Sequence, residues 1–186
     1  YSFHADEKDF ECFYEMQKKT YMRIFERVGI GDQTFLTSAS GGTFSQYSHE
    51  FQTVTDAGED MIHVCEKCKI AINDEIKDKA PLCQGCGSSE FLVAKSIEVG
   101  NIFPLKTKFS DAFGFTFQDD QGTKLPVIMG CYGIGLGRLM GTIVEVHNDN
   151  RGIIWPESVA PFHVYLVELS NEHGKVKKYA EELYHL

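Results

Sequence analysis

The chain carries one glycine-rich junction, Gly130-Cys131-Tyr132-Gly133-Ile134-Gly135-Leu136-Gly137-Arg138, between an apolar run and a stretch with helical periodicity. A dinucleotide-binding turn requires the pattern G-x-G-x-x-G, followed about 20 positions later by an acidic residue on a second strand. Counted from Gly133, that pattern needs glycine where the chain has Arg138, and the acidic residue is missing. The alternative is a strand that feeds a helix with a guanidinium in its first turn. Glycines allow close approach to a flat ligand, and arginine pairs with phosphate in a bidentate manner.

Hydrophobic spacing predicts helices and strands on both sides of this junction. An amphipathic helix is predicted at residues 6–28, where apolar side chains recur at i, i+3 and i+4 and Gly29 provides a stop. A second helix is predicted at residues 136–146. Strand-like runs between turn residues are predicted at 34–39, 49–55, 61–64, 96–103, 115–118 and 127–132. This order indicates an α+β fold, an antiparallel sheet with helices packed on it.

A change in composition predicts a domain boundary near residues 148–160. The chain is polar at 148–152, and prolines flank the segment 156–161. Beyond this linker, residues 162–169 are typical of a buried strand and residues 175–186 of a helix. We therefore predict one domain over residues 1–150 and the beginning of a second, α/β domain over residues 160–186.

Two Cys-x-x-Cys pairs, separated by residues 69–82, interrupt the first domain. Their four members are Cys65, Cys68, Cys83 and Cys86. This spacing is typical of a closed, tetrahedral, structural zinc site, a pair of zinc knuckles, with iron as a possible substitute. Gly85 and Gly87 would permit the tight turn in which backbone amides point at sulfur. Free cysteines or a redox pair are the alternative interpretations.

Bulk properties limit the classes of function. The chain has 186 residues and a formal net charge of -9, which argues against DNA or RNA binding through overall charge. No stretch approaches the ~20 apolar residues that span a bilayer, so no membrane partner is expected. The paired cysteines suit a metal in a reducing compartment, which predicts a cytoplasmic protein.

The glycine-rich junction resembles motif 3 of class II aminoacyl-tRNA synthetases, in which glycines alternate before an arginine that lies against ATP. Further blocks, in the right order, resemble prolyl-tRNA synthetases in particular. They are Tyr1-Ser2-Phe3-His4; Gly41-Gly42 with Ser48-His49-Glu50-Phe51 and Ala57-Gly58-Glu59-Asp60; Ile97-Glu98-Val99-Gly100-Asn101-Ile102-Phe103 with Leu105, Thr107 and Lys108; Gly130-Cys131-Tyr132-Gly133-Ile134-Gly135; and Gly152-Ile153-Ile154-Trp155-Pro156 with Ala160-Pro161-Phe162. The resemblance implies the C-terminal part of a class II catalytic domain at 1–150, with a four-cysteine zinc-knuckle insertion at 65–86. It implies the start of an anticodon-binding domain at 160–186.

The resemblance also implies a reaction and its catalytic residues. Proline and ATP would form prolyl-adenylate and pyrophosphate, and the prolyl group would then pass to tRNA(Pro). Arg138 would be the cationic clamp on ATP, and Glu98 the carboxylate that helps to hold Mg²⁺ or ATP. A carboxylate at a strand edge that caps a turn is the structural alternative for Glu98.

Five further residues are implied as substrate-binding. Cys131 would line the proline pocket, His49 would lie near it and Thr107 would touch the nucleotide, with Gly133 and Gly135 beside the substrates. A lone cysteine on an apolar strand is usually a small buried hydrophobe, and a lone histidine is more often structural, so both alternatives stay open.

The chain departs from the family pattern in several places. Asn101 stands where many relatives carry histidine, and the spacer at 43–47 is longer than usual. Motif 1, the arginine-bearing part of motif 2 and the usual homodimer interface would lie upstream of Tyr1. The isolated chain is therefore expected to be inactive.

The Cys insertion occupies the place of the editing domain of many bacterial relatives, and at about thirty residues it is too short to be one. We expect no editing of alanyl-tRNA in cis.

Three alternatives to a prolyl enzyme are compatible with the sequence. A synthetase-like paralogue could bind tRNA or a protein without catalysis, although the presence of Glu98 and Arg138 counts against it. A stand-alone zinc-ribbon module would need a basic, aromatic surface, whereas charges of both signs alternate around the cysteines. A seryl-, threonyl- or glycyl-specific class II enzyme is the nearest competitor. Cys131 and the Ser-His-Glu-Phe run argue against that competitor.

Overall fold

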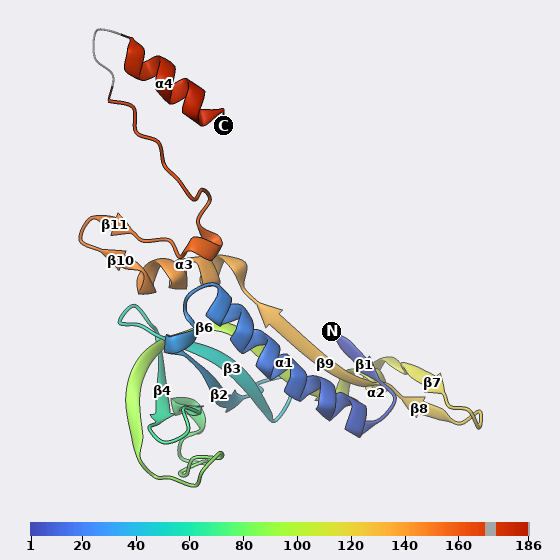
Figure 1. Ribbon diagram of the computed structural model, residues 1–186. Coiled ribbons are helices and arrows are strands. Elements are labelled where there is room, and N and C mark those ends of the chain that lie inside the picture. The colour runs from blue at the N-terminus through green and yellow to red at the C-terminus, as the bar shows by residue number, and fades with distance from the viewer. Residues whose placement is uncertain (170–173, 186) are drawn as a thin grey trace.

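The computed structural model describes residues 1–169 and 174–185, and its centre is a seven-stranded sheet in the order β1-β9-β6-β3-β2-β5-β4 (Figure 1). The strands of this sheet are β1 (Ser2–His4), β2 (Thr34–Ser40), β3 (Tyr47–Val54), β4 (Asp60–Cys65), β5 (Ala71–Asn73), β6 (Phe91–Lys106) and β9 (Ile128–Ile134). The α-helices are α1 (Glu7–Arg27), α2 (Lys108–Phe113), α3 (Leu136–Val146) and α4 (Lys175–Tyr184). Short elements complete the described chain: η1 (Gly31–Gln33), η2 (Asp74–Ile76), η3 (Glu157–Val159), and the hairpins β7 (Thr116–Gln118) with β8 (Lys124–Pro126) and β10 (Asn148–Asp149) with β11 (Gly152–Ile153).

The long strand β6 organises the sheet, because successive parts of it pair with β4, β3 and β9. Since β4 pairs with both β5 and β6, the strands β6, β3, β2, β5 and β4 close into a ring. Ile62, Val64 and Ala71 form a small separate core there. The predicted all-antiparallel sheet is wrong at one pair, because β2 and β5 run parallel. The Cys insertion brings β5 beside β2 with both strands running in the same direction. The alternation of polar and apolar residues in a sequence does not show the direction of a neighbouring strand.

Helix α1 covers one face of β3, β6 and β9, as the apolar stripe predicted. Its N-cap Asp6 accepts a hydrogen bond from the Asp9 amide at 2.9 Å, which satisfies an otherwise unpaired donor of the first turn. The buried side chains of α1 pack against this face of the sheet; they are Phe10, Tyr14, Tyr21 and Phe25. Gly100 sits under the helix, where a Cβ would lie 3.3 Å from the rings of both Tyr21 and Phe25. The opposite face of the sheet remains open for a site.

The C-terminal prediction is only partly confirmed. Helix α4 is present up to Tyr184, and Leu186 lies outside the described residues. The predicted buried strand at 162–169 is wrong, since this segment is extended, unpaired among the described strands and exposed, with Tyr165 at 87% (Figure 1). An apolar run becomes a strand only when a neighbouring strand accepts its backbone hydrogen bonds. Within residues 1–169 and 174–185, no helix combines the length and apolarity that a bilayer crossing requires.

Candidate active site

The glycine-rich junction forms the end of β9 and the start of α3. Gly135 is the N-cap of α3 and accepts a hydrogen bond from the Leu139 amide at 2.8 Å. Arg138 therefore lies in the first helical turn. Its Nη1 donates to the backbone oxygen of Glu98 and to Glu98 Oε2, both at 3.2 Å. The other carboxylate oxygen, Oε1, accepts from Asn101 Nδ2 at 2.7 Å. Both oxygens of Glu98 are thus held in place.

A β-bulge explains why Glu98 reaches this position. Phe51 pairs with Gly100 and Gln52 pairs with Glu98, so Val99 is an extra residue in β6. An extra residue inverts the alternation of side chains beyond it. Glu98 consequently shares a face with Asn101, three positions away, while Gly100 faces α1.

A cavity of about 320 Å³ lies at this junction. It is lined by Glu98, Val99, Gly100, Asn101, Gly133, Ile134, Gly135 and Arg138. Strand pairing brings Asn101 opposite Gly133, where a Cβ would lie 3.2 Å from Asn101 Oδ1. The missing side chain at 133 therefore leaves room in the cavity. We call this the polar cavity: it combines a cation that can pair with phosphate and a carboxylate and amide of the kind that hold Mg²⁺.

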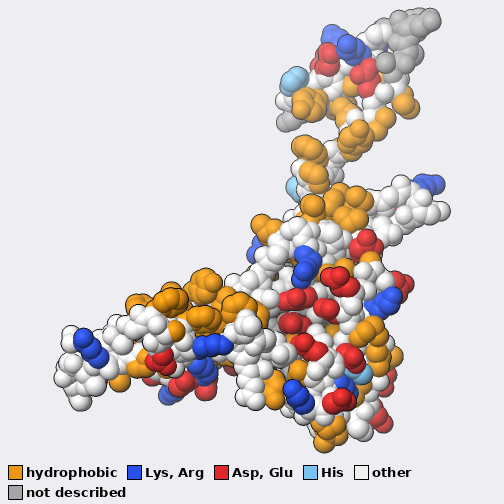
Figure 2. All heavy atoms as spheres, turned by 180° about the vertical axis from the view of Figure 1, so that it is seen from behind, with side chains coloured by type: hydrophobic (Ala, Val, Ile, Leu, Met, Phe, Trp, Pro, Cys, Tyr) orange, Lys and Arg blue, Asp and Glu red, His pale blue; other side chains and the backbone are white. Residues whose placement is uncertain are grey.

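A second cavity, which we call the apolar cavity, lies further back along β9. Its volume is about 340 Å³, and it is lined by Tyr1, Phe44, Leu105, Phe109, Ser110, Phe113, Phe115, Met129 and Cys131. Cys131 and Gly133 lie on the same side of β9, about 7 Å apart, because side chains alternate along a strand. Tyr132, between them, points the other way, toward Phe13 and Tyr14 of α1. Figure 2 shows hydrophobic side chains gathered over the arm formed by α2, β7 and β8, and acidic side chains on the neighbouring body of the molecule.

The structure brings together most, but not all, of the residues singled out in the sequence. Arg138, Glu98, Gly133 and Gly135 line the polar cavity, and Cys131 lines the apolar one. Two other residues, His49 and Thr107, line neither cavity.

His49 faces α1, and its Nδ1 lies 3.0 Å from Tyr14 Oη. Burial, together with the nearby Lys18, lowers the pKa of His49 to about 4, so its ring is neutral near pH 7. Thr107 is the N-cap of α2, where its carbonyl accepts from the Asp111 amide at 2.8 Å. For these two residues the structure shows packing and capping contacts, and their assignment to substrates stays a prediction.

Sequence reasoning missed the carboxylate of Glu50. It lies on the open face of β3, opposite Asn101 on β6, and its Oε2 accepts from Gln52 Nε2 at 2.9 Å and Asn73 Nδ2 at 3.2 Å. Burial raises the pKa of Glu50 to about 7, against the effect of the Gln52 amide, and Glu98 adds to the rise. The alternation of side chains along the strand could have revealed this carboxylate. Phe51 belongs to the core, so its neighbour Glu50 must lie on the other face of the sheet.

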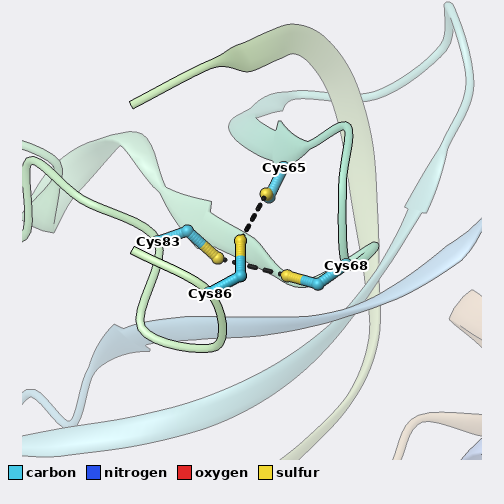
Figure 3. A group of neighbouring side chains, drawn as sticks. All are labelled: Cys65, Cys68, Cys83 and Cys86. Carbon is cyan, nitrogen blue, oxygen red and sulfur yellow. Dashed lines mark hydrogen bonds between the residues drawn. The ribbon is translucent and has the colours of Figure 1, made fainter. Parts of the chain in front are cut away.

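The four paired cysteines converge at the end of β4 (Figure 3). Their sulfur atoms all lie within 4.8 Å of one another, with Cys65–Cys86 at 3.5 Å and Cys68–Cys83 at 3.2 Å. A tetrahedron with metal–sulfur bonds of ~2.3 Å has edges of ~3.8 Å, so this donor set fits a metal centre with four thiolate ligands. We call it the four-cysteine centre.

The two knuckles have the same backbone shape. The amide of Lys69 donates to the Cys65 carbonyl at 3.0 Å, and that of Gly87 donates to the Cys83 carbonyl at 2.8 Å. Both donors have left-handed φ values, 59° and 70°, which glycine adopts readily and lysine rarely. Burial raises the pKa of the Cys65 thiol, but the backbone amides of Cys68 and Lys67 outweigh it and bring the pKa to about 6. Backbone amides directed at sulfur therefore favour the Cys65 thiolate, the form that binds metal, whereas the hydrogen bond with Cys83 raises the pKa of Cys68 to about 12.

Comparison with known proteins places the chain in a family. Residues 1–147 match the family profile of the tRNA synthetase class II core domain (G, H, P, S and T). A proline--tRNA ligase of Ehrlichia chaffeensis is 36% identical over 198 residues, which cover 99% of this chain and 46% of that protein. One from Ruegeria is 34% identical, with the same two coverages. A third, from Thermoanaerobacter, is 46% identical over 107 residues, or 58% of this chain and 18% of that protein.

The fold is found again in a solved structure. Prolyl-tRNA synthetase from Cryptosporidium parvum, complexed with L-proline and AMP, aligns with a TM-score of 0.60 at 16% identity, over 98% of this chain and 33% of that one. The chain spans about half the length of the curated relatives that match nearly all of it. The matched range, residues 1–147, contains the residues that line the two cavities and the four cysteines. The chain belongs to the family of class II tRNA synthetase core domains.

Proposed function

We propose that the protein is a proline--tRNA ligase, which activates proline with ATP and transfers it to tRNA(Pro). The observation that carries this proposal is the arrangement along β9, where Cys131 of the apolar cavity is two positions from Gly133 of the polar cavity, on the same side of the strand. Proline is a small apolar ring with a carboxylate that must meet the α-phosphate of ATP, so its two parts need these two environments side by side. The names of the similar proteins support the same assignment.

The residues of the polar cavity have defined parts in the first step. A proline carboxylate oxygen attacks the α-phosphorus, the bond to the β-phosphate oxygen breaks, and pyrophosphate leaves with the electron pair. Arg138, half-exposed at 51%, turns from Glu98 toward the phosphate oxygens, on which negative charge accumulates. Glu98 and Asn101 would hold Mg²⁺, which neutralises phosphate charge when bound. In the second step a hydroxyl at the tRNA 3′ end attacks the prolyl carbonyl, and AMP leaves.

The remaining parts of the chain have roles around this centre. We assign structural zinc, with iron as a substitute, to Cys65, Cys68, Cys83 and Cys86, because all four positions of a tetrahedron are filled. We assign residues 160–186 to the start of an anticodon-binding domain. The protein is proposed to be a cytoplasmic homodimer without editing of alanyl-tRNA in cis. The intact Arg138–Glu98 pair argues against a non-catalytic paralogue.

Pyrophosphate exchange into ATP tests the proposal. The full-length protein is incubated with each of the twenty amino acids, ATP and labelled pyrophosphate. We expect exchange with proline and weak exchange with alanine, because a hydrophobic pocket discriminates poorly against a smaller apolar substrate. Exchange with serine, threonine or glycine in place of proline, or with no amino acid, would refute the assignment. Deacylation of alanyl-tRNA by the same protein tests the absence of editing.

A further inference from the structure

The insertion that carries the four-cysteine centre is built into the catalytic sheet. Its strand β5 lies between β2 and β4, and pairs in parallel with β2 at Thr37 and Ser38. It also pairs with β4 at three positions. Any change in the position of the insertion is therefore transmitted to β2 through the backbone.

Three side chains of the insertion extend this connection to the β2–β3 hairpin. Glu75 Oε1 accepts a hydrogen bond from the Ser40 backbone amide at 2.7 Å, at the last residue of β2. Gln84, inside the second Cys-x-x-Cys knuckle, accepts from the Ser38 hydroxyl at 3.0 Å. Asn73, at the end of β5, donates to Glu50 on β3. Each strand of the hairpin is thus held by a residue that the cysteines position.

The loop of this hairpin forms a wall of the apolar cavity. The loop starts at Gly41, directly after Ser40, and a Cβ there would lie 2.2 Å from the Ser45 carbonyl oxygen. The Phe44 amide donates to the Gly41 carbonyl at 2.9 Å, so the turn is compact. Phe44 lines the apolar cavity, with its ring 5.0 Å from that of Phe103, and Lys108 donates to the Thr43 carbonyl. The position of Ser40 therefore sets the position of Phe44.

We propose that the four-cysteine insertion positions the amino-acid pocket, and that Glu75 is a positioning residue that acts through the Ser40 amide on the loop carrying Phe44. This inference rests on the proposed function, since it takes the apolar cavity as the proline pocket. It predicts that the insertion controls the affinity for proline and has little effect on that for ATP. The polar cavity is built by β6, β9 and α3, with no residue of the insertion.

Three variants of the full-length protein separate this role from a general structural one. Glu75→Ala removes the acceptor for the Ser40 amide, and Glu75→Gln keeps an acceptor oxygen without the charge. Asp78→Ala is the matched control: it removes the same charge from an exposed residue of the same insertion that makes no hydrogen bond or ion pair within the described chain. For each variant, KM for proline, KM for ATP and kcat are measured by pyrophosphate exchange, and the dissociation constant of proline by calorimetry.

We expect Glu75→Ala to raise KM and the dissociation constant for proline about 5- to 10-fold, with KM for ATP changed less than about 2-fold. Glu75→Gln should restore most of the affinity, and Asp78→Ala should match the wild type. Gln84→Ala, which removes the acceptor for the Ser38 hydroxyl, should also weaken the binding of proline and leave that of ATP unchanged. It serves as the test if Glu75→Ala does not fold. Unchanged proline binding in both Glu75→Ala and Gln84→Ala would overturn the inference, and so would an equal rise in KM for proline and for ATP. Absence of proline-dependent exchange in the wild type would overturn the proposed function and this inference with it.

Discussion

The guanidinium of Arg138 lies 3.2 Å from the carboxylate of Glu98, although the two residues are 40 positions apart in the chain. Two features bring them together. Pairing of β6 with β9 aligns Gly100 with Ile134, and the bulge at Val99 turns Glu98 to the open face. The pair is half open to water, with Arg138 at 51% and Glu98 at 22% exposure, so its attraction is modest and a phosphate can compete for the arginine.

Replacement of Arg138 tests its role on ATP. Arg138→Ala in the full-length protein should lower kcat/KM for proline-dependent pyrophosphate exchange about 100- to 1,000-fold, because charge on the transferred phosphate loses its cation. Arg138→Lys should recover only part of the lost kcat/KM, since lysine cannot pair with phosphate in a bidentate manner. The control is Arg151→Ala, at an exposed turn between β10 and β11. Equal activity in Arg138→Ala and Arg151→Ala would contradict the role.

Filling the space at Gly133 should weaken ATP binding. A Cβ there meets Asn101 Oδ1 at 3.2 Å, so Gly133→Val displaces Asn101 from Glu98 and occupies part of the polar cavity. We expect KM for ATP to rise about 10-fold, because each carbon added to a tight site excludes ligand volume or forces a shift. Gly137→Ala is the control, as a Cβ at that position meets no atom within 4 Å. If KM for ATP stays at the wild-type value in Gly133→Val, ATP does not occupy this cavity.

The raised pKa of Glu50 makes stability depend on pH. With a pKa of about 7 in the folded protein, above its ordinary value of 4.5, Glu50 holds its proton more firmly when folded. Its contribution is fully present below pH 4.5 and is lost as the pH rises through 7. The free energy of unfolding of Glu50→Gln should therefore match that of the wild type at pH 5. At pH 8 it should exceed the wild-type value by about 2 kcal/mol, because a neutral amide avoids burial of a charge.

Thermal unfolding midpoints of the full-length protein at pH 5 and pH 8 measure this effect. Glu59→Gln, at an exposed residue, is the matched control, and its midpoint should equal that of the wild type at each of the two pH values. A Glu50→Gln variant that is less stable than the wild type at pH 8 would show that the carboxylate is needed in its charged form.

The four-cysteine centre should bind one metal ion per chain. Cys83→Ser removes one thiolate ligand, so elemental analysis of the full-length protein should show metal content falling from about one to near zero. The melting temperature should fall by about 5 °C or more, since the insertion is paired with β2 and β4. Cys12→Ser, at an exposed cysteine of α1, should change neither quantity. Retention of a full equivalent of metal by Cys83→Ser would exclude the site.

The sequence by itself determined the local elements and the chemistry of the site. The apolar stripe and the Asp6 cap of α1, the start of α3 at the glycine junction, and the spacing of the four cysteines depend on residues near one another in the chain. Periodicity and ligand spacing report such short-range relations directly. The roles of Arg138 and Glu98 came from a resemblance, and the structure places both at one cavity.

Only the tertiary structure decided which face each side chain occupies and which strand lies beside which. The bulge at Val99 moved Glu98 beside Asn101, and pairing of β3 with β6 put His49 under α1 and Glu50 on the other face. The parallel place of β5 beside β2, and the unpaired chain at 162–169, depend on partners distant in sequence. Side-chain direction in a strand has a period of two, so a single extra residue reverses the face that the pattern predicts for the residues beyond it. Without a neighbouring strand, a predicted strand does not form at all.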